Sequence, residues 1–199
     1  YRQVLASARD KRDEIEATFP KLTRFLTGYD LKHVYEPASE TVDLSRLICG
    51  SEGTLAFVTE AKLDLTPIPT FRTLVNVKYD SFESALRNAT VMVAAEALSV
   101  ETVDSKVLDL ARGDIIWHSV KSLIEDVPGK NMMGINIVEF AGDDADEQAR
   151  KVKALTAKLD SLMQAGQGGV IGYQICDELS SIETIYAMRK KAVGLLGNA

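Results

Sequence analysis

The chain has 199 residues, of which 46% are hydrophobic, and this is enough for a buried core in one large domain or two small ones. Its 23 Lys and Arg against 29 Asp and Glu give a formal net charge of -6, which excludes long-range attraction to nucleic acid or anionic lipid. The expected partner is therefore a small molecule or another protein, with membrane association at most peripheral.

The cysteines and the amino terminus bear on the cellular setting. Cys49 and Cys176 lie far apart in apolar stretches, so we expect reduced, buried thiols rather than a disulfide or a metal site. No apolar run approaches the roughly 18 residues of a membrane span, and the amino terminus does not resemble a signal sequence. We expect a cytoplasmic protein, and the start at Tyr1 suggests a piece cut from a longer chain.

The first third of the chain contains a predicted helix and a predicted strand. Residues 2–16 combine charged residues with good helix formers, which predicts a largely exposed helix. Apolar and polar residues alternate over 55–65, which is the period of a strand. Pro67 and Pro69 form a stiff connector, and we place a domain boundary between residues 67 and 68.

Beyond the connector, strands and helices alternate. The predicted order is strand 71–79, helix 81–98, strand 100–103, helix 104–111, an ambiguous apolar segment 115–124, strand 132–140, helix 143–164, strand 168–176 and helix 180–196. Two successive strand–helix–strand units predict an α+β fold of the ferredoxin-like type, with an antiparallel sheet and helices on one face.

The most informative stretch is the turn that runs from Gly50 to Thr54. Gly50 and Gly53, with hydroxyl residues between and after them, free main-chain N–H groups to face an anion such as a phosphate. The turn lacks the ending of a P-loop and the GxGxxG pattern of a dinucleotide-binding helix. An ordinary glycine turn entering a strand is the alternative on spacing alone.

Residues 50–60, GSEGTLAFVTE, resemble the motif that closes the flavin-binding domain in the FAD-linked oxidase family, which includes vanillyl-alcohol oxidase, D-lactate dehydrogenases and D-2-hydroxyglutarate dehydrogenases. Residues 27–31, TGYDL, resemble a family segment near the flavin, whereas Ala56 stands where the family usually has Gly. The resemblance implies FAD as the cofactor, residues 1–67 as the C-terminal part of an FAD-binding domain and residues 68–199 as an incomplete substrate-capping domain. The cofactor-binding residues that it implies are Gly28, Tyr29, Gly50, Ser51, Glu52, Gly53, Thr54 and Phe57.

The predicted helix 180–196 is similar to the capping-domain helix whose arginine binds the substrate carboxylate, and Arg189 occupies that position. A planar guanidinium can hold a carboxylate by two parallel hydrogen bonds. The alternative is a solvated basic run with Lys190 and Lys191 that complements the helix dipole. Val193 stands where some D-2-hydroxyglutarate dehydrogenases have Thr, so this position offers no hydroxyl to the far end of the substrate.

The resemblance implies a parent enzyme that oxidises a D-2-hydroxy acid to a 2-keto acid by hydride transfer to flavin. The residues of the motifs most resemble those of long bacterial family members, which carry an iron-sulfur half outside this chain. This resemblance favours D-2-hydroxyglutarate as the substrate. D-lactate is the alternative substrate, and a noncatalytic ligand-binding or interaction module is the alternative of another class. Because the earlier phosphate-binding loop is missing, we expect the isolated chain to hold FAD weakly and to be inactive.

Other polar residues are expected to serve the structure. We do not assign His33 or His118 as a general base, because the resemblance places the family's base and metal-binding histidines in a later part of the capping domain. The acidic pairs 143–144 and 177–178 are expected to be structural, the first of them at a helix start. We therefore assign no catalytic residue and no metal ligand to this chain.

Overall fold

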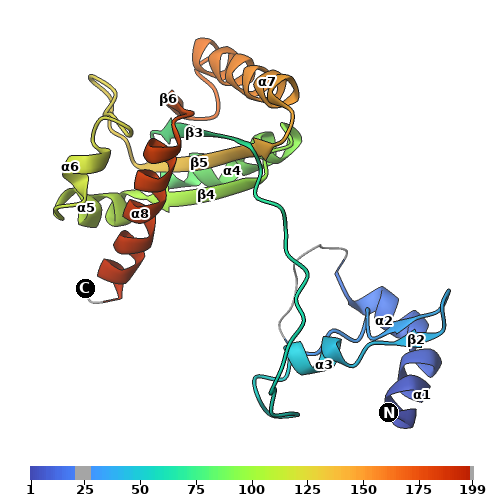
Figure 1. The fold of residues 1–199 in the computed structure, drawn as a ribbon. Helices are drawn as coiled ribbons and strands as arrows, with labels where there is room; N and C mark the ends of the chain where they lie inside the picture. The colour runs from blue at the N-terminus through green and yellow to red at the C-terminus, as the bar shows by residue number, and fades with distance from the viewer. Residues whose placement is uncertain (21–27, 198–199) are drawn as a thin grey trace. The chain divides into compact units, whose positions relative to one another are not determined.

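The computed structural model describes residues 1–20 and 28–197, and it divides the chain into two compact units, Tyr1–Leu65 and Thr66–Ala199 (Figure 1). Each unit has its own hydrophobic core. The boundary between the two units lies at the start of the proline-containing connector, where the side chains are exposed.

The first unit packs short helices against a two-stranded hairpin. Its elements are α1 (Arg2–Asp10), α2 (Arg12–Thr18), β1 (Tyr35–Glu36), β2 (Thr41–Val42) and α3 (Ser45–Cys49). The predicted helix 2–16 is interrupted at Lys11, whose ψ of 18° leaves the helical range. The small core of this unit is built on Ala8, Val34 and Tyr35.

The predicted strand 55–65 is wrong, because no strand is found at those residues. Alternation shows which side chains share a face, but a strand also needs a neighbour that satisfies its main-chain groups. Among the residues that the structure describes, no segment pairs with this stretch, and Leu55, Phe57, Leu63 and Leu65 stay exposed.

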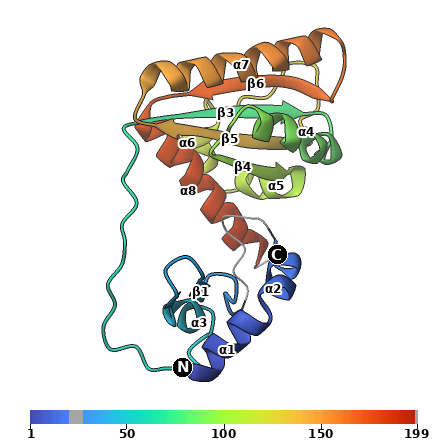
Figure 2. The ribbon, with the colours of Figure 1, turned by 90° about the vertical axis from the view of Figure 1, so that its right-hand side faces the viewer.

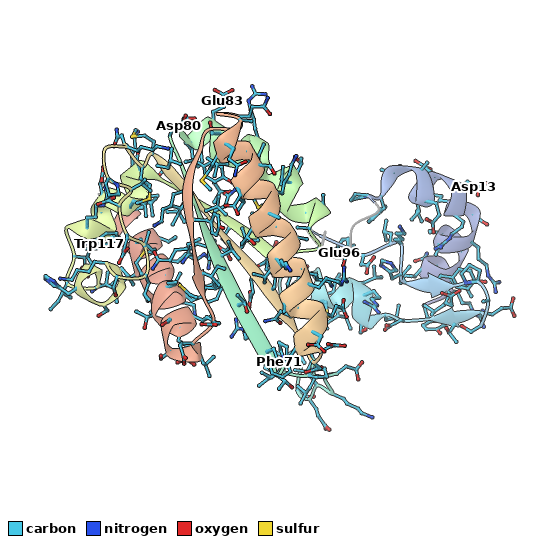
Figure 3. All side chains as sticks on the ribbon, turned by 90° about the horizontal axis from the view of Figure 1, so that it is seen from above. Asp13, Phe71, Asp80, Glu83, Glu96 and Trp117 are labelled. Atoms are coloured by element: carbon cyan, nitrogen blue, oxygen red, sulfur yellow. The ribbon has the colours of Figure 1, made fainter. Side chains whose placement is uncertain are left out.

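The second unit confirms the ferredoxin-like arrangement. Its elements are β3 (Phe71–Tyr79), α4 (Phe82–Ala94), β4 (Ser99–Asp104), α5 (Ser105–Arg112), α6 (Trp117–Val120), β5 (Gly134–Gly142), α7 (Ala145–Gln164), β6 (Val170–Cys176) and α8 (Leu179–Leu196). The sheet order is β4-β5-β3-β6, and every neighbouring pair is antiparallel. Figure 3 marks the two ends of β3, with Phe71 at its start and Asp80 just after its end.

Polar side chains define three helix starts in this unit. The Ser81 hydroxyl accepts a hydrogen bond from the Ser84 N–H at 3.1 Å, and Asp104 accepts one from the Val107 N–H at 2.8 Å. Asp144 accepts from two main-chain N–H groups at the start of α7. Because these first N–H groups have no partner inside a helix, the three caps explain where α4, α5 and α7 begin.

The helices cover both faces of the sheet, so the expectation of helices on one face is corrected. Helices α4 and α7 pack on the face of Val75 and Val77, as in a ferredoxin-like unit. Helices α5, α6 and α8 pack on the face of Leu74 and Ile137. Figure 2 shows α7 and α8 on opposite sides of the sheet. Periodicity missed this because the second face of β3 carries Arg72, Asn76 and Lys78, which is typical of a solvent-facing side, whereas Asn76 and Lys78 are buried.

We expect Ile137→Ala to lower the free energy of unfolding by about 2–5 kcal/mol, because Ile137 is fully buried under α8 and the change leaves a cavity. Ile175→Ala on the edge strand β6 is the matched control, with a cost of roughly 1 kcal/mol or less, because Ile175 is 46% exposed. Urea unfolding, followed by the fluorescence of Trp117, the single tryptophan, measures the free energy of unfolding of both variants. Equal losses in the two variants would contradict this assignment of the core.

Candidate functional site

The glycine-flanked turn at 51–54 is a tight turn with two positive-φ residues. Glu52 has φ 50° and Gly53 has φ 79°, as in a type I′ turn, and the Thr54 N–H donates to the Ser51 carbonyl at 2.9 Å. Positive φ is uncommon for a residue with a Cβ, so Glu52 stores backbone strain. Such strain persists only where the surrounding structure holds the residue, and it is frequent at ligand-binding sites.

The turn exposes main-chain donors while its hydroxyls are used internally. The N–H groups of Glu52 and Gly53 have no hydrogen-bond partner among the described residues. By contrast, the Ser51 hydroxyl donates to the Ile48 carbonyl at 2.8 Å, and the Thr54 hydroxyl donates to the Ser51 carbonyl at 2.6 Å. Two free adjacent N–H groups fit an anionic group such as a dinucleotide phosphate.

The two sequence motifs of the first unit meet at a pair of glycines. A Cβ added at Gly50 would overlap the carbonyl group of Gly28 and lie 3.2 Å from the Cα of Tyr29. Gly28 itself has φ 85°, which a glycine adopts without strain. The structure thus brings 28–29 and 50–54 together, although Thr27, the first residue of the upstream motif, lies outside the described residues.

Two aromatic residues assigned to the cofactor are available at the surface. Tyr29 is 45% exposed, and Phe57 is 93% exposed in the segment that follows the turn. Ala56, the departure from the family pattern, is exposed as well. Nothing among the described residues packs over Phe57 enough to fix it, so the glycine contact and the turn are the ordered part of this candidate site.

We expect Gly50→Ala to force the two motifs apart, because the new methyl group meets main-chain atoms that cannot rotate away. Overpacking of this kind costs about 1–3 kcal/mol, so amide exchange at the hydrogen-bonded N–H groups of Leu31, Gly50, Ser51 and Thr54 should become roughly 5- to 150-fold faster. Hydrogen–deuterium exchange measures this. Gly142→Ala is the control, because a Cβ there has nothing within 4 Å. Unchanged exchange in Gly50→Ala would show that the close approach is absent.

Arg189 lies in the second unit, on helix α8. One side of this helix is buried through Ile185, Met188 and Ala192, and Arg189 lies at the edge of that side with its side chain 37% exposed. Its Nε atom forms an ion pair with Oε2 of Glu101 on β4. Arg189 is therefore not a freely solvated basic residue.

A hydrogen-bonded cluster holds α8 against the sheet one turn before Arg189. Tyr186 on α8 donates from its hydroxyl to Glu139 on β5 at 2.7 Å. Arg72 on β3 donates to the other oxygen of Glu139 at 2.6 and 2.9 Å, and its guanidinium stacks on the Tyr186 ring at 5.8 Å. Ser99 on β4 donates to Glu139 at 3.2 Å. Residues from three elements, α8, β3 and β4, thus converge on one carboxylate of β5.

The electrostatics of this cluster favour an ionised Glu139. Burial would raise the pKa of Glu139, but the hydrogen bonds from Tyr186 and Arg72 outweigh it and hold the pKa below its ordinary value of 4.5. Burial and the neighbouring Glu139 raise the pKa of Tyr186 to about 12, so its hydroxyl is a donor at neutral pH. The cluster is therefore a charged anchor for α8 under physiological conditions.

Because the pKa of Glu139 is lower in the folded state, its contribution to stability is present above about pH 4.5 and is lost as the pH falls through the folded value. We expect Glu139→Gln to lower the free energy of unfolding by roughly 1.5–3 kcal/mol at pH 7, and the gap to the wild type to narrow below pH 4.5. Urea titrations at several pH values test this. Glu83→Gln, in an exposed ion pair on α4, should show little difference at any pH. A gap for Glu139→Gln that is independent of pH would contradict the ionised anchor.

Other residues singled out from the sequence have structural surroundings. Asp143 accepts from the N–H and hydroxyl of Thr70, and Asp144 caps α7, so this acidic pair is used structurally as predicted. His33 lies 2.9 Å from the buried Asp30 through its Nδ1 atom. His118 is exposed on α6.

The cysteines differ from each other. Cys176 is buried, as predicted, but Cys49 is exposed at the end of the short helix α3, so the expectation of two buried thiols is corrected. The five-residue α3 buries none of its side chains completely, which explains the error. In residues 1–20 and 28–197, no three His, Cys, Asp or Glu side chains gather in a way that could hold a metal ion.

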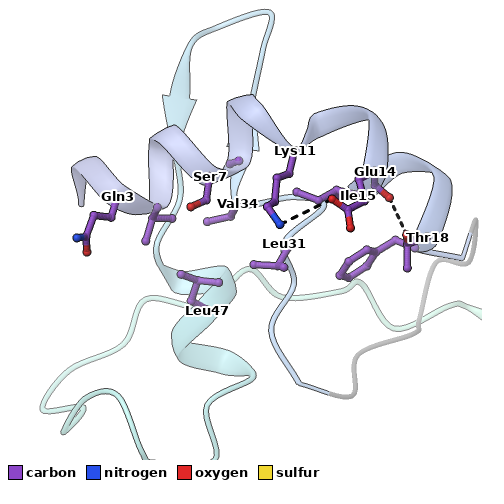
Figure 4. A pocket seen from close by; sticks show the side chains of 12 residues that line it. Gln3, Ser7, Lys11, Glu14, Ile15, Thr18, Leu31, Val34 and Leu47 are labelled. Carbon is purple, nitrogen blue, oxygen red and sulfur yellow. Dashed lines mark hydrogen bonds and ion pairs between the residues drawn. The ribbon is translucent and has the colours of Figure 1, made fainter.

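An apolar hollow of about 470 Å³ lies in the first unit, between α1 and α2 on one side and Leu31, Val34 and Leu47 on the other (Figure 4). No predicted site residue lines it. Within the described part of the chain, no helix combines the length and the apolar content needed to cross a membrane.

Comparison with known proteins defines the class of this chain. Residues 68–199 match the family described as FAD linked oxidases, C-terminal domain, and the chain belongs to this family. Over all 199 residues it is 64% identical to a protein of Pantoea ananatis, 63% identical to one of Escherichia coli and 54% identical to one of Haemophilus influenzae, each named D-2-hydroxyglutarate dehydrogenase. The chain spans about a fifth of the length of these relatives. The family resemblance predicted from the motifs is confirmed, and with it FAD as the family's cofactor.

Sequence reasoning missed Glu101, Arg72 and Glu139. Each is a charged residue within a strand, on the sheet face that α8 covers. Charged residues are rarely buried unless they are paired, so their positions in these strands could have signalled partners. The identity of those partners depends on the strand register and on the path of α8, which local patterns do not contain.

Proposed function

We propose that the chain is part of an FAD-dependent dehydrogenase that oxidises a D-2-hydroxy acid, D-2-hydroxyglutarate in particular, to the 2-keto acid. The observation that carries the proposal is the similarity of the whole chain to proteins named D-2-hydroxyglutarate dehydrogenase. Neither D-lactate as the substrate nor a noncatalytic module is favoured by that similarity. The same proposal includes a cytoplasmic location and an iron-sulfur half outside these residues.

In this proposal residues 1–67 are the C-terminal part of the FAD-binding domain. The turn residues Gly50, Ser51, Glu52, Gly53 and Thr54, with Gly28, Tyr29 and Phe57, form its contribution to the cofactor site. The free N–H groups of Glu52 and Gly53 support this, because they can donate to an anionic group of the dinucleotide. FAD, when bound, supplies the hydride acceptor for oxidation of the substrate carbon that bears the hydroxyl.

Residues 68–199 then belong to the substrate-capping domain, in which Arg189 binds a carboxylate of the substrate. The support is its place at the edge of the buried side of α8 and its half-buried guanidinium. A guanidinium in this setting stays charged and offers its donors in a fixed plane. It therefore fixes the orientation of a bound carboxylate, which a flexible ammonium does less well.

In the complete flavoenzyme we expect Arg189→Lys to raise KM for D-2-hydroxyglutarate by roughly 10- to 150-fold, because two charge-assisted hydrogen bonds worth about 1.5–3 kcal/mol are replaced by a point charge. The value of kcat should change less, since the carboxylate is bound in both the ground and transition states. Steady-state kinetics and the flavin content of each preparation measure these effects.

Lys153→Gln on α7 removes one positive charge from the opposite face of the sheet and is the control, with KM expected to stay within about twofold. A complete enzyme that contains no flavin, or an Arg189→Lys variant with the KM of the wild type, would overturn the proposed function. Flavin that is reduced by D-lactate but not by D-2-hydroxyglutarate would overturn the substrate assignment.

A further inference from the structure

Arg189 is held by a carboxylate from the neighbouring strand. Glu101 lies in β4, where it is paired with Ile137 of β5 in the antiparallel register. It therefore points to the same face as Ile137, which is the face that α8 covers. The two side chains of the ion pair are 37% exposed for Arg189 and 28% exposed for Glu101. This pair is thus partly shielded from water, unlike the exposed pairs on the helix surfaces.

The ion pair engages one edge of the guanidinium. The contact of Glu101 is with Nε of Arg189, and no other ion pair of Arg189 occurs among the residues described. A guanidinium carries five N–H donors in one plane, and the terminal pair of Nη groups faces away from the Nε edge. A second carboxylate can therefore bind at the terminal fork of Arg189 while Glu101 keeps its place.

Holding the Nε edge has an energetic consequence for a ligand. A free arginine side chain loses about 2 kcal/mol of rotamer entropy when it is fixed, and a ligand that must order it binds more weakly by part of that amount. Glu101 is itself fixed, because β4 is hydrogen-bonded to β5 along its length. A donor held by a carboxylate on a rigid strand is ordered before the ligand arrives.

We propose that Glu101 is a positioning residue, which holds Arg189 by its Nε edge so that the terminal Nη fork is presented to the carboxylate of the 2-hydroxy acid. This inference rests on the proposed function. It makes the strand β4 part of the substrate site, and it assigns to Glu101 a role that depends on the position of its side-chain oxygen more than on its charge.

Substitutions that separate geometry from charge test this role in the complete flavoenzyme. Glu101→Gln keeps an oxygen beside Nε, so KM should stay within about twofold of the wild type or fall, because the guanidinium is less neutralised. Glu101→Ala and Glu101→Leu remove the group that holds the guanidinium, so KM should rise by up to about tenfold, because the ligand must then order Arg189, with a smaller change in kcat. The Leu variant preserves side-chain volume in case the Ala variant is poorly folded.

Three results would overturn the inference. If Gln, Ala and Leu all lower KM, Glu101 competes with the substrate. If Ala and Leu leave KM unchanged and lower only the melting temperature, its role is purely structural. If Gln raises KM as much as Ala, charge and not geometry is what matters. Glu83→Gln, in the exposed pair with Arg87, is the control for loss of a carboxylate.

The same experiment separates failure of this inference from failure of the proposed function. If Arg189→Lys raises KM and the Glu101 series does not follow the predicted order, only the positioning role is wrong. If Arg189→Lys leaves KM unchanged, the substrate-binding role of Arg189 is wrong, and the positioning role falls with it. Flavin content, measured for every variant, shows whether each preparation is a folded holoenzyme.

Discussion

The burial of β3 on both faces is the constraint on which the second unit depends. All of its residues from Thr73 to Tyr79 are buried, so each face needs its own cover. Helices α4 and α7 cover one face, and α5, α6 and α8 cover the other. Placing α8 over the sheet is what gives its polar residues strand partners. The packing of the core therefore determines the position of Arg189, and its ion pair with Glu101 follows from that position.

The second unit could be predicted from the sequence because its patterns are local. Strand 71–79 coincides with β3, and the helices predicted to start at residues 81 and 104 begin there, with Ser81 and Asp104 as their caps. The second cover of the sheet could not be predicted in the same way, because the face of β3 that α8 covers carries polar residues such as Asn76 and Lys78, and a polar face reads as solvent-exposed in the sequence. The failure at 55–65 has a related cause, since pairing with a distant segment is a tertiary property.

The candidate site was predictable to the extent that it rests on motifs. The glycine-flanked turn, residues 28–29 and Arg189 were all selected from short patterns. Their surroundings were not, because the contact of Gly50 with Gly28 joins segments that are separated by 21 residues, and the pair of Arg189 with Glu101 joins a helix to a strand far upstream. A glycine in the sequence indicates only that there is no room for a side chain at that position. The tertiary structure determines which group lies close to it.

Two carboxylates on the sheet face that α8 covers make different contacts with that helix. Glu139 is almost fully buried and is bound by Tyr186 and Arg72, so it fixes where the helix lies. Glu101 is more exposed, and its ion pair among the described residues is with the guanidinium of Arg189 near the edge of the helix. Buried charged groups are costly to separate, whereas half-exposed pairs contribute less to stability. The buried pair therefore anchors the helix, and the half-exposed pair can be changed with a smaller loss of stability.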